Sequence, residues 1–195
     1  MTNSLDVFRN YINEKVAVSE TELDRIKTLS SAVTLRRKEH LLKEGETWKY
    51  RAFVNKGLLR TYRTDENGQE HTISFAVENW WVGDGESYIS EKPTVYNIEA
   101  LDPSEIICWK KQDFNMLMDE IPALKEMSEL LMSRSLIASQ NRIFLSNSQT
   151  AEDKYNNFIS AFPEFAKRAP LHLVASYLGV TRETLSRIRR QFAQK

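Results

Sequence analysis

The side chains best suited to chemistry lie near the C-terminus, where residues 182–190 read RETLSRIRR. An arginine can donate two hydrogen bonds to O6 and N7 of guanine, and a glutamate can accept one from N4 of cytosine. Arginines can also bind phosphates, and a serine can contribute further polar contacts. This group of residues therefore predicts contacts to the bases and backbone of nucleic acid.

The residues around this segment have the spacing of a helix-turn-helix over residues 171–190. Such a motif needs a small residue where the helices cross, a glycine where the turn requires positive φ, and an apolar residue where the second helix packs back. Ala175, Gly179 and Leu185 occupy these positions, and Thr181 is a suitable cap for a second helix that begins at Arg182. The alternative is an ordinary helical hairpin whose basic face is simply solvated. The other predicted core residues of the motif are Val174, Leu178, Val180 and Ile188.

If the apolar side of the second helix, residues 182–191, faces inward, its polar side faces solvent. We expect Arg182 and Glu183, in the first turn, to enter a major groove, with Arg187 one turn later. Residues at the flanks are expected to contact phosphates, and Ser176 is expected beside His172 at the edge of the groove. The predicted DNA-binding residues are Thr181, Arg182, Glu183, Ser186, Arg187, Arg189, Arg190 and His172.

A long helix is predicted ahead of this motif, from Pro122 to Ser146, because proline suits a first turn and no glycine or further proline follows. Two columns of apolar residues recur in it every seven positions, which keeps both on one side of the helix. The stripe could pack on the chain's own sheet or on a partner helix. We favour the partner helix of a homodimer, because so small a sheet domain could hardly cover the whole stripe. The dimer-helix residues are Leu124, Leu130, Leu131, Ile137, Ala138, Phe144 and Leu145.

Short apolar or alternating runs between residues 32 and 110 predict a compact antiparallel sheet or roll. Five of the six glycines fall between residues 45 and 85. Residues 72–77 alternate with period two, and residues 65–68, Asp-Glu-Asn-Gly, are a hairpin signal. We therefore expect about seven or eight strands, preceded by a helix over residues 20–30 with Ser19 as its cap.

The charges are balanced overall but segregated along the chain. The 195 residues carry 27 Lys and Arg and 27 Asp and Glu, with 41% hydrophobic residues, which excludes a polycation and a disordered chain. Residues 1–150 have 19 basic and 23 acidic side chains, a net charge of −4, whereas residues 151–195 have 8 and 4, a net charge of +4. A short basic module is typical of a phosphate-binding surface.

Membrane and catalytic features are not apparent in the sequence. No apolar run approaches the roughly 18 residues of a membrane span, and the N-terminus has no basic and apolar leader, so we expect a cytoplasmic protein without a membrane partner. The single Cys108 is expected to be a buried thiol, and the histidines at 40, 71 and 172 are scattered. We find no nucleophile motif, no His-x-His pair and no phosphate-cradling glycine loop, so we expect no enzyme and no metal site.

The segment 182–187, following Leu-Gly-Val-Thr at 178–181, resembles the recognition segment of the Crp/Fnr family of bacterial transcription regulators. Residues 43–46, 54–60, 83–84 and 99–101 resemble the turn and strand signatures of that family's cyclic-nucleotide-binding-type roll. The resemblance implies a homodimer that reads a palindromic operator in double-stranded DNA, with its two recognition helices in successive major grooves. It also implies sensing in the roll and RNA polymerase as a further partner.

The effector pocket that the resemblance implies departs from the family pattern. In nucleotide-binding members a Gly-Glu pair holds the ribose, and an Arg-Ser/Thr-Ala segment holds the phosphate. Alignment places Asp84 at the glutamate, Thr94 at the arginine and Tyr96 at the small residue. Without the guanidinium, the charge-assisted contact to a cyclic phosphate is lost, so we do not expect cyclic AMP to bind in the usual manner. The implied pocket residues are Gly83, Asp84, Glu86, Thr94 and Tyr96.

The residues available to hold a cofactor, and the length of the C-terminus, also differ from those of some members of that family. The cysteines that hold an iron–sulfur cluster are absent, and only His40 and His71 could serve a haem in the roll. We therefore expect no certain cofactor, and an unknown small-molecule effector or none. The chain ends five residues after Arg190, so the β-hairpin wing of many relatives is expected to be missing or replaced by something N-terminal to the motif.

The predicted fold class is α+β, in three parts. These are a jelly-roll-like double-stranded β-helix over residues 1–118, a dimerisation helix over 119–148 and a helix-turn-helix domain over 149–195. One alternative is a small-molecule-binding or metal-dependent cupin-like β-roll protein, in which the helical C-terminus is only an interaction module.

Overall fold

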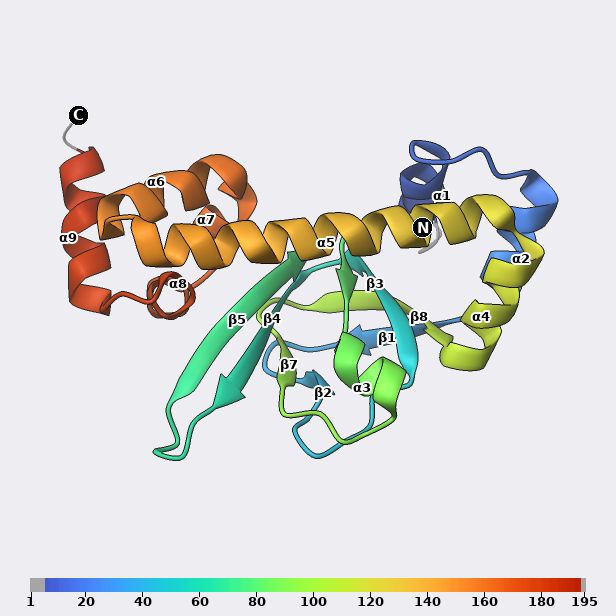
Figure 1. Cartoon of the computed structure of the whole chain (residues 1–195), viewed down its shortest axis with the longest axis horizontal. Helices are drawn as coiled ribbons and strands as arrows, with labels where there is room; N and C mark the ends of the chain where they lie inside the picture. Colours follow the sequence, from blue (N-terminus) through green and yellow to red (C-terminus); the bar gives the residue numbers. More distant parts are fainter. Residues whose placement is uncertain (1–5, 194–195) are drawn as a thin grey trace.

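The computed structural model describes residues 6–193, which form a β-roll beneath one long helix, with helical clusters at both ends (Figure 1). The described residues contain two four-stranded antiparallel sheets, with strand orders β1-β8-β3-β6 and β2-β7-β4-β5. This architecture agrees with the predicted roll. The strands are β1 (Ser30–Leu35), β2 (His40–Leu42), β3 (Tyr50–Lys56), β4 (Leu58–Thr64), β5 (Glu70–Val77), β6 (Trp81–Val82), β7 (Asn97–Ala100) and β8 (Ser104–Lys110).

The predicted hairpin joins β4 to β5. The Asp65 carboxylate accepts hydrogen bonds from the backbone N–H groups of Asn67 and Gln69, both at 2.9 Å. Gly68 has φ +79°, a conformation that glycine adopts without strain. The sequence therefore closes this turn with local hydrogen bonds, and β5 is positioned as an edge strand of its sheet.

Alternation along the strands separates a core inside the roll from a second core on the outer face of the first sheet. Ala52 and Val54 pack inward, whereas Phe53 packs outward. The buried Cys108 belongs to the inner core, and burial raises the pKa of its thiol to about 12. A reactive thiolate is accordingly disfavoured at neutral pH.

The outer core is covered by helices that precede the roll in the sequence and by helices that follow it. Helix α2 (Glu20–Thr28) begins at the predicted cap, where the Ser19 hydroxyl and the Glu22 carboxylate form a capping box. Helix α1 (Asp6–Asn13) was not predicted, although its apolar Phe8, Tyr11 and Ile12 have helical spacing and are buried. Helices α3 (Gly85–Ser90) and α4 (Lys111–Glu120) follow within and after the roll.

Helix α5 (Pro122–Ser148) runs along the roll and on to the C-terminal helices (Figure 1). It begins at Pro122, so residues 119 and 120, which the sequence assigned to the central helix, end α4 instead. Beyond α5, four helices form a third core, to which the roll contributes Leu58 and Phe75 from its strands and Leu101 from the turn after β7. They are α6 (Ala151–Ala161), α7 (Pro163–Arg168), α8 (Leu171–Leu178) and α9 (Arg182–Ala193).

Candidate nucleic-acid interface

Helices α8 and α9 form the helix-turn-helix predicted from residues 171–190. Gly179 ends α8 in the left-handed conformation with φ +66°, and the Val180 N–H donates to the Ala175 carbonyl at 3.0 Å. The Thr181 hydroxyl accepts a hydrogen bond from the Thr184 N–H at 3.1 Å. Each of these bonds fixes the turn, so the direction of α9 relative to α8 is set by local structure.

The apolar side of α9 faces the core of the C-terminal helices. Leu185 and Ile188 are buried, as are Ala175 and Leu178 of α8. The ring centroid of Phe192 lies 6.0 Å from that of Tyr155 on α6. These contacts orient α9, and with it the polar residues on the opposite side.

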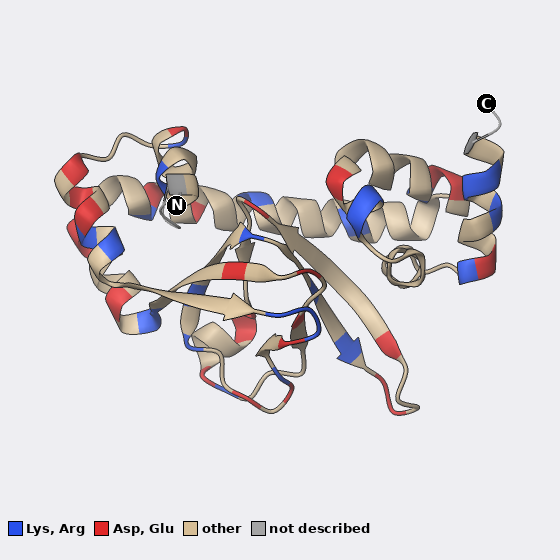
Figure 2. Ribbon diagram, turned by 180° about the vertical axis from the view of Figure 1, so that it is seen from behind, with Lys and Arg blue, Asp and Glu red and all other residues tan. Residues whose placement is uncertain are grey.

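The opposite side of α9 presents the predicted DNA-reading residues to solvent. Within residues 6–193 no ion pair involves any arginine of α9, and Glu183 likewise has no cationic partner. Basic residues are visible along this helix in Figure 2. Ser186 is only half-buried, and the Thr181 hydroxyl also donates to Thr184 Oγ1 at 3.0 Å. The exposed members are Thr181, Arg182, Glu183, Arg187, Arg189, Arg190 and, on α8, His172.

The Ser176 side chain is hydrogen-bonded to the roll, although the sequence analysis predicted that it lies beside His172 at the edge of the DNA groove. Its hydroxyl accepts the Thr72 N–H of β5 at 2.9 Å and lies 3.4 Å from the Glu70 carbonyl. The side chain that was expected to meet DNA therefore holds α8 against the roll. A contact with DNA would require these hydrogen bonds to break.

A charged contact between the two parts was missed by the sequence reasoning. Arg168 of α7 contacts Glu78 at 2.8 Å and Asp102 at 3.1 Å, so one basic charge of the C-terminal module is neutralised by the roll. Burial raises the pKa of Glu78, but hydrogen bonds from Arg168 and the Gly57 N–H outweigh it, and the pKa lies below its usual value. The net charge of residues 151–195 concealed this pairing, because a count by region ignores contacts between regions.

Helix α5 divides the predicted apolar stripe between two environments. Leu124 is buried and Leu131 packs partly against the outer core, whereas Leu130, Ile137 and Phe144 are 50%, 56% and 66% exposed. Ala138 and Leu145 line a hollow between α5 and the C-terminal helices. The predicted stripe therefore consists of two columns, of which one faces the roll and the C-terminal helices and the other faces outward. Three further exposed apolar residues, which heptad counting missed, lie about 100° or more around the helix from this outward column: Met132, Leu136 and Ile143.

The predicted effector residues gather at the start of α3, but their polar groups satisfy one another. The Asp84 carboxylate is buried and accepts from the Thr94 hydroxyl at 2.6 Å and from the Glu86 N–H at 3.0 Å. The Thr94 hydroxyl also accepts from the Tyr96 N–H at 3.0 Å. The Glu86 side chain is exposed, so it lies outside this network.

The inner wall of this region is closed by tryptophan. A Cβ added at Gly83, which has φ +151°, would lie 2.4 Å from Trp48 Nε1. The backbone N–H of Trp48 donates a hydrogen bond to the Ser87 hydroxyl at 2.9 Å. Glycine at position 83 is thus required by close packing, not by the approach of a ligand.

The histidines of the roll are engaged in local hydrogen bonds. His40 lies 3.0 Å from the Tyr62 hydroxyl, and His71 lies 2.8 Å from the Asp65 carboxylate. In the described part of the chain, no group of three or more His, Cys, Asp or Glu side chains is arranged to hold a metal ion. No helix among residues 6–193 is long and apolar enough to span a membrane.

Comparison with known proteins bears on both the roll and the helical module. The family model of the cyclic nucleotide-binding domain matches residues 32–120. The transcriptional activator protein FnrA of Stutzerimonas stutzeri is 26% identical over 175 residues, covering 82% of this chain and 69% of the relative. Electron transport regulator A of Shewanella oneidensis is 26% identical over 192 residues, covering 90% and 74%. These similarities support the resemblance of this chain to the Crp/Fnr family of regulators.

The fold of this chain also matches a solved structure. FixK2 of Bradyrhizobium japonicum superimposes with a TM-score of 0.74 over 85% of each chain, at 17% sequence identity. The matched fraction extends beyond the roll, so the fold is shared by more than the domain that the family model covers. The Crp/Fnr resemblance of the sequence is thereby confirmed.

Proposed function

We propose that this chain is a homodimeric transcription regulator of the Crp/Fnr type that reads a two-fold symmetric operator in double-stranded DNA through α9. The observation that carries the proposal is the exposed side of α9, whose arginines form no ion pair within residues 6–193. Elsewhere in the chain, Arg60, Arg25 and Arg168 are each paired with a carboxylate. Unpaired, outward guanidinium groups on a helix held by a helix-turn-helix suit recognition of base edges and phosphates.

Within this proposal the residues of α9 have separate roles. Arg182 and Glu183 stand in the first turn and Arg187 follows one turn later, so these three would contact base edges. Ser186 would add a polar contact at the same face. Phosphate contacts are assigned to Arg189, Arg190, Thr181 and His172, and the bound regulator would act through RNA polymerase.

The outward face of α5 supports the homodimer. At least half of the surface of each of three large apolar side chains is exposed there: Leu130, Ile137 and Phe144. Such a row on a helix is stabilised when a second helix covers it. A second copy would carry a second α9. The spacing of the two helices would then define the spacing of the half-sites.

The network around Asp84 argues that the roll does not take cyclic AMP in the usual manner. A cyclic phosphate would meet the Thr94 hydroxyl in place of a guanidinium, and the buried Asp84 carboxylate, 2.6 Å from that hydroxyl, would repel it. The cupin-like metal enzyme remains the second candidate, but no observation in the described residues favours it.

Two measurements test the proposed function. Selection from random duplexes should recover a two-fold symmetric sequence whose half-site centres lie about 10 base pairs, or a multiple of this, apart. Light scattering should give a mass near twice the 22.7 kDa of the chain. Recovery of no common sequence, or of a single asymmetric site by a monomer, would contradict the proposal.

A matched pair of variants assigns the dimer to α5. Ile137→Glu places a carboxylate on the outward apolar face and should convert the dimer to a monomer. Ser135→Glu adds the same charge two residues away, on the other side of the helix, and should leave the mass unchanged. Equal masses for the two variants would show that the dimer interface lies elsewhere.

A further inference from the structure

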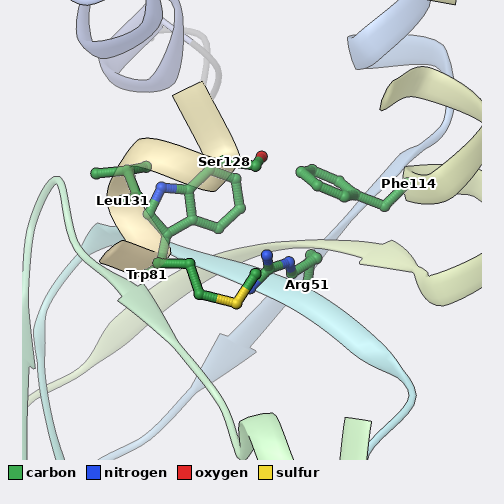
Figure 3. Close-up of a pocket in the computed structure, with 6 residues that line it drawn as sticks. Arg51, Trp81, Phe114, Ser128 and Leu131 are labelled. Atoms are coloured by element: carbon green, nitrogen blue, oxygen red, sulfur yellow. The ribbon is translucent and has the colours of Figure 1, made fainter. Parts of the chain in front are cut away.

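A pocket lies between the outer face of the first sheet and α5, outside the interior of the roll. Arg51 of β3 and Trp81 of β6 form its sheet side, and Phe114 of α4 closes one end. Its volume is about 420 Å³, including the space open to solvent. Figure 3 shows these side chains pointing toward one another around the hollow. The remaining lining residues, all on α5, are Ser128, Leu131 and Met132.

Arg51 brings a positive charge into this pocket that the described part of the chain does not neutralise. No carboxylate within residues 6–193 forms an ion pair with it, and its Nε is shielded from solvent without a hydrogen-bond partner. Arg60, whose side chain is buried, contacts both Glu70 and Glu99, whereas the partly buried Arg51 contacts neither. A guanidinium Nε–H that is shielded from water without an acceptor costs free energy, which an anion that accepts its hydrogen bond would recover.

The surroundings of Arg51 are aromatic. Its guanidinium carbon lies 5.4 Å from the ring centroid of Tyr88 and 5.5 Å from that of Phe114. These rings hold the guanidinium in place by cation–π contacts, but they leave its N–H donors without acceptors. The site therefore offers a positioned, planar donor pair beside an apolar hollow.

We propose that this pocket binds a small organic anion, with a carboxylate on Arg51 and an apolar body between Trp81, Phe114 and Leu131. A carboxylate matches the two parallel N–H donors of a guanidinium, and the flat indole and phenyl rings suit a planar or narrow apolar group. The Ser128 hydroxyl supplies a further polar contact at the α5 wall. The binding claim is independent of DNA binding, since no residue of the pocket belongs to α8 or α9.

The probes are benzoate, 1-naphthoate and hexanoate, titrated calorimetrically into the full-length protein, with benzamide and 1-naphthamide as neutral counterparts. At least one carboxylate should bind once per chain with Kd below 1 mM, and its amide should bind at least tenfold more weakly. Arg51→Gln should weaken the carboxylate at least tenfold and change the amide less than twofold. Arg63→Gln, which removes an exposed arginine of β4, is the control and should leave binding unchanged.

A second variant tests the site without removing Arg51. Met132→Glu places a carboxylate on the rim of the pocket, where it should compete with the probe and weaken it at least tenfold. Leu136→Glu places the same charge one turn further along the exposed side of α5, outside the pocket lining, and should have no effect. Both substituted positions are more than half exposed, so the fold does not depend on either side chain.

Five results would overturn the proposal. These are no carboxylate binding below 1 mM, equal binding by the wild type and Arg51→Gln, or equal binding by Met132→Glu and Leu136→Glu. The fourth is conversion of a dimer to a monomer by Arg51→Gln, because the anion on Arg51 would then be a carboxylate of a second copy of the chain. Loss of binding in Thr94→Val with retention in Arg51→Gln would place the ligand inside the roll and would also contradict the assignment.

Discussion

Helix α9 and the region from Gly83 to Tyr96 are both rich in polar side chains, but they use them in opposite ways. In the Gly83–Tyr96 region, Asp84 and Thr94 are buried and hydrogen-bonded to each other at 2.6 Å. On α9 the arginines are exposed and form no ion pair with the described residues. The first arrangement stabilises the chain itself, and the second leaves its hydrogen-bonding capacity for a partner.

This difference predicts that α9, and not the Gly83–Tyr96 region, is the site that binds a partner. A ligand at the Asp84 region would have to replace hydrogen bonds that already exist, and a phosphate would also face a carboxylate. A duplex at α9 would replace only water. The contrast predicts that substitutions in the two regions affect different measurements.

The largest expected effect is on DNA affinity. Replacing Arg182 and Arg187 together by alanine removes two base contacts per subunit, each worth ~1–3 kcal/mol. Affinity for the selected operator should fall by roughly 100-fold or more, measured by fluorescence anisotropy at fixed salt. The unfolding temperature should be unchanged, because both side chains are exposed. Arg63→Ala is the control, and an equal loss in that variant would show that the effect is only a change in net charge.

The next largest effect should be on the stability of the fold, with DNA affinity unchanged. Thr94→Val keeps the shape of the side chain but leaves the buried Asp84 carboxylate and the Tyr96 N–H each without one partner. The free energy of unfolding in urea should fall by about 1–3 kcal/mol, while operator affinity stays within twofold. Thr64→Val, at a half-buried threonine of β4 that has no such bonds, should be nearly neutral. A large loss of operator affinity in folded Thr94→Val would remove the contrast between the regions.

The smallest effect concerns the contact between Arg168 and Glu78, which joins the C-terminal helices to the roll. Because the pKa of Glu78 is lowered in the folded chain, its stabilising contribution is present above its usual pKa and is lost as the pH falls through the lowered value. The fall in unfolding temperature between pH 7 and pH 4 should therefore be about 2 °C smaller in Glu78→Gln than in the wild type. Glu164→Gln, which removes an exposed contact to Lys167, should follow the wild type. Identical pH profiles for Glu78→Gln and the wild type would contradict a role for this carboxylate.

Features that depend on residues close together in the sequence could be predicted, whereas contacts between distant residues could not. The helix-turn-helix was predictable because Gly179, Thr181 and Leu185 act through local geometry and spacing. The pairing of Arg168 with Glu78 was not, because it joins residues 90 positions apart and neither has a distinctive neighbour. The same holds for Arg51, because its lack of a carboxylate partner among residues 6–193 is apparent only from the folded structure. Helix α1 was missed because eight residues give a short periodic signal.

The central claim is that α9 reads base sequence, and the most direct test is a base-resolved selection with two single variants of that helix. The account predicts that Arg187→Ala loses preference at one base pair in each half-site, at symmetric positions. Arg189→Ala, assigned to a phosphate, should bind more weakly with an unchanged sequence profile. An unchanged profile for Arg187→Ala, with affinity reduced equally in both variants, would contradict the account.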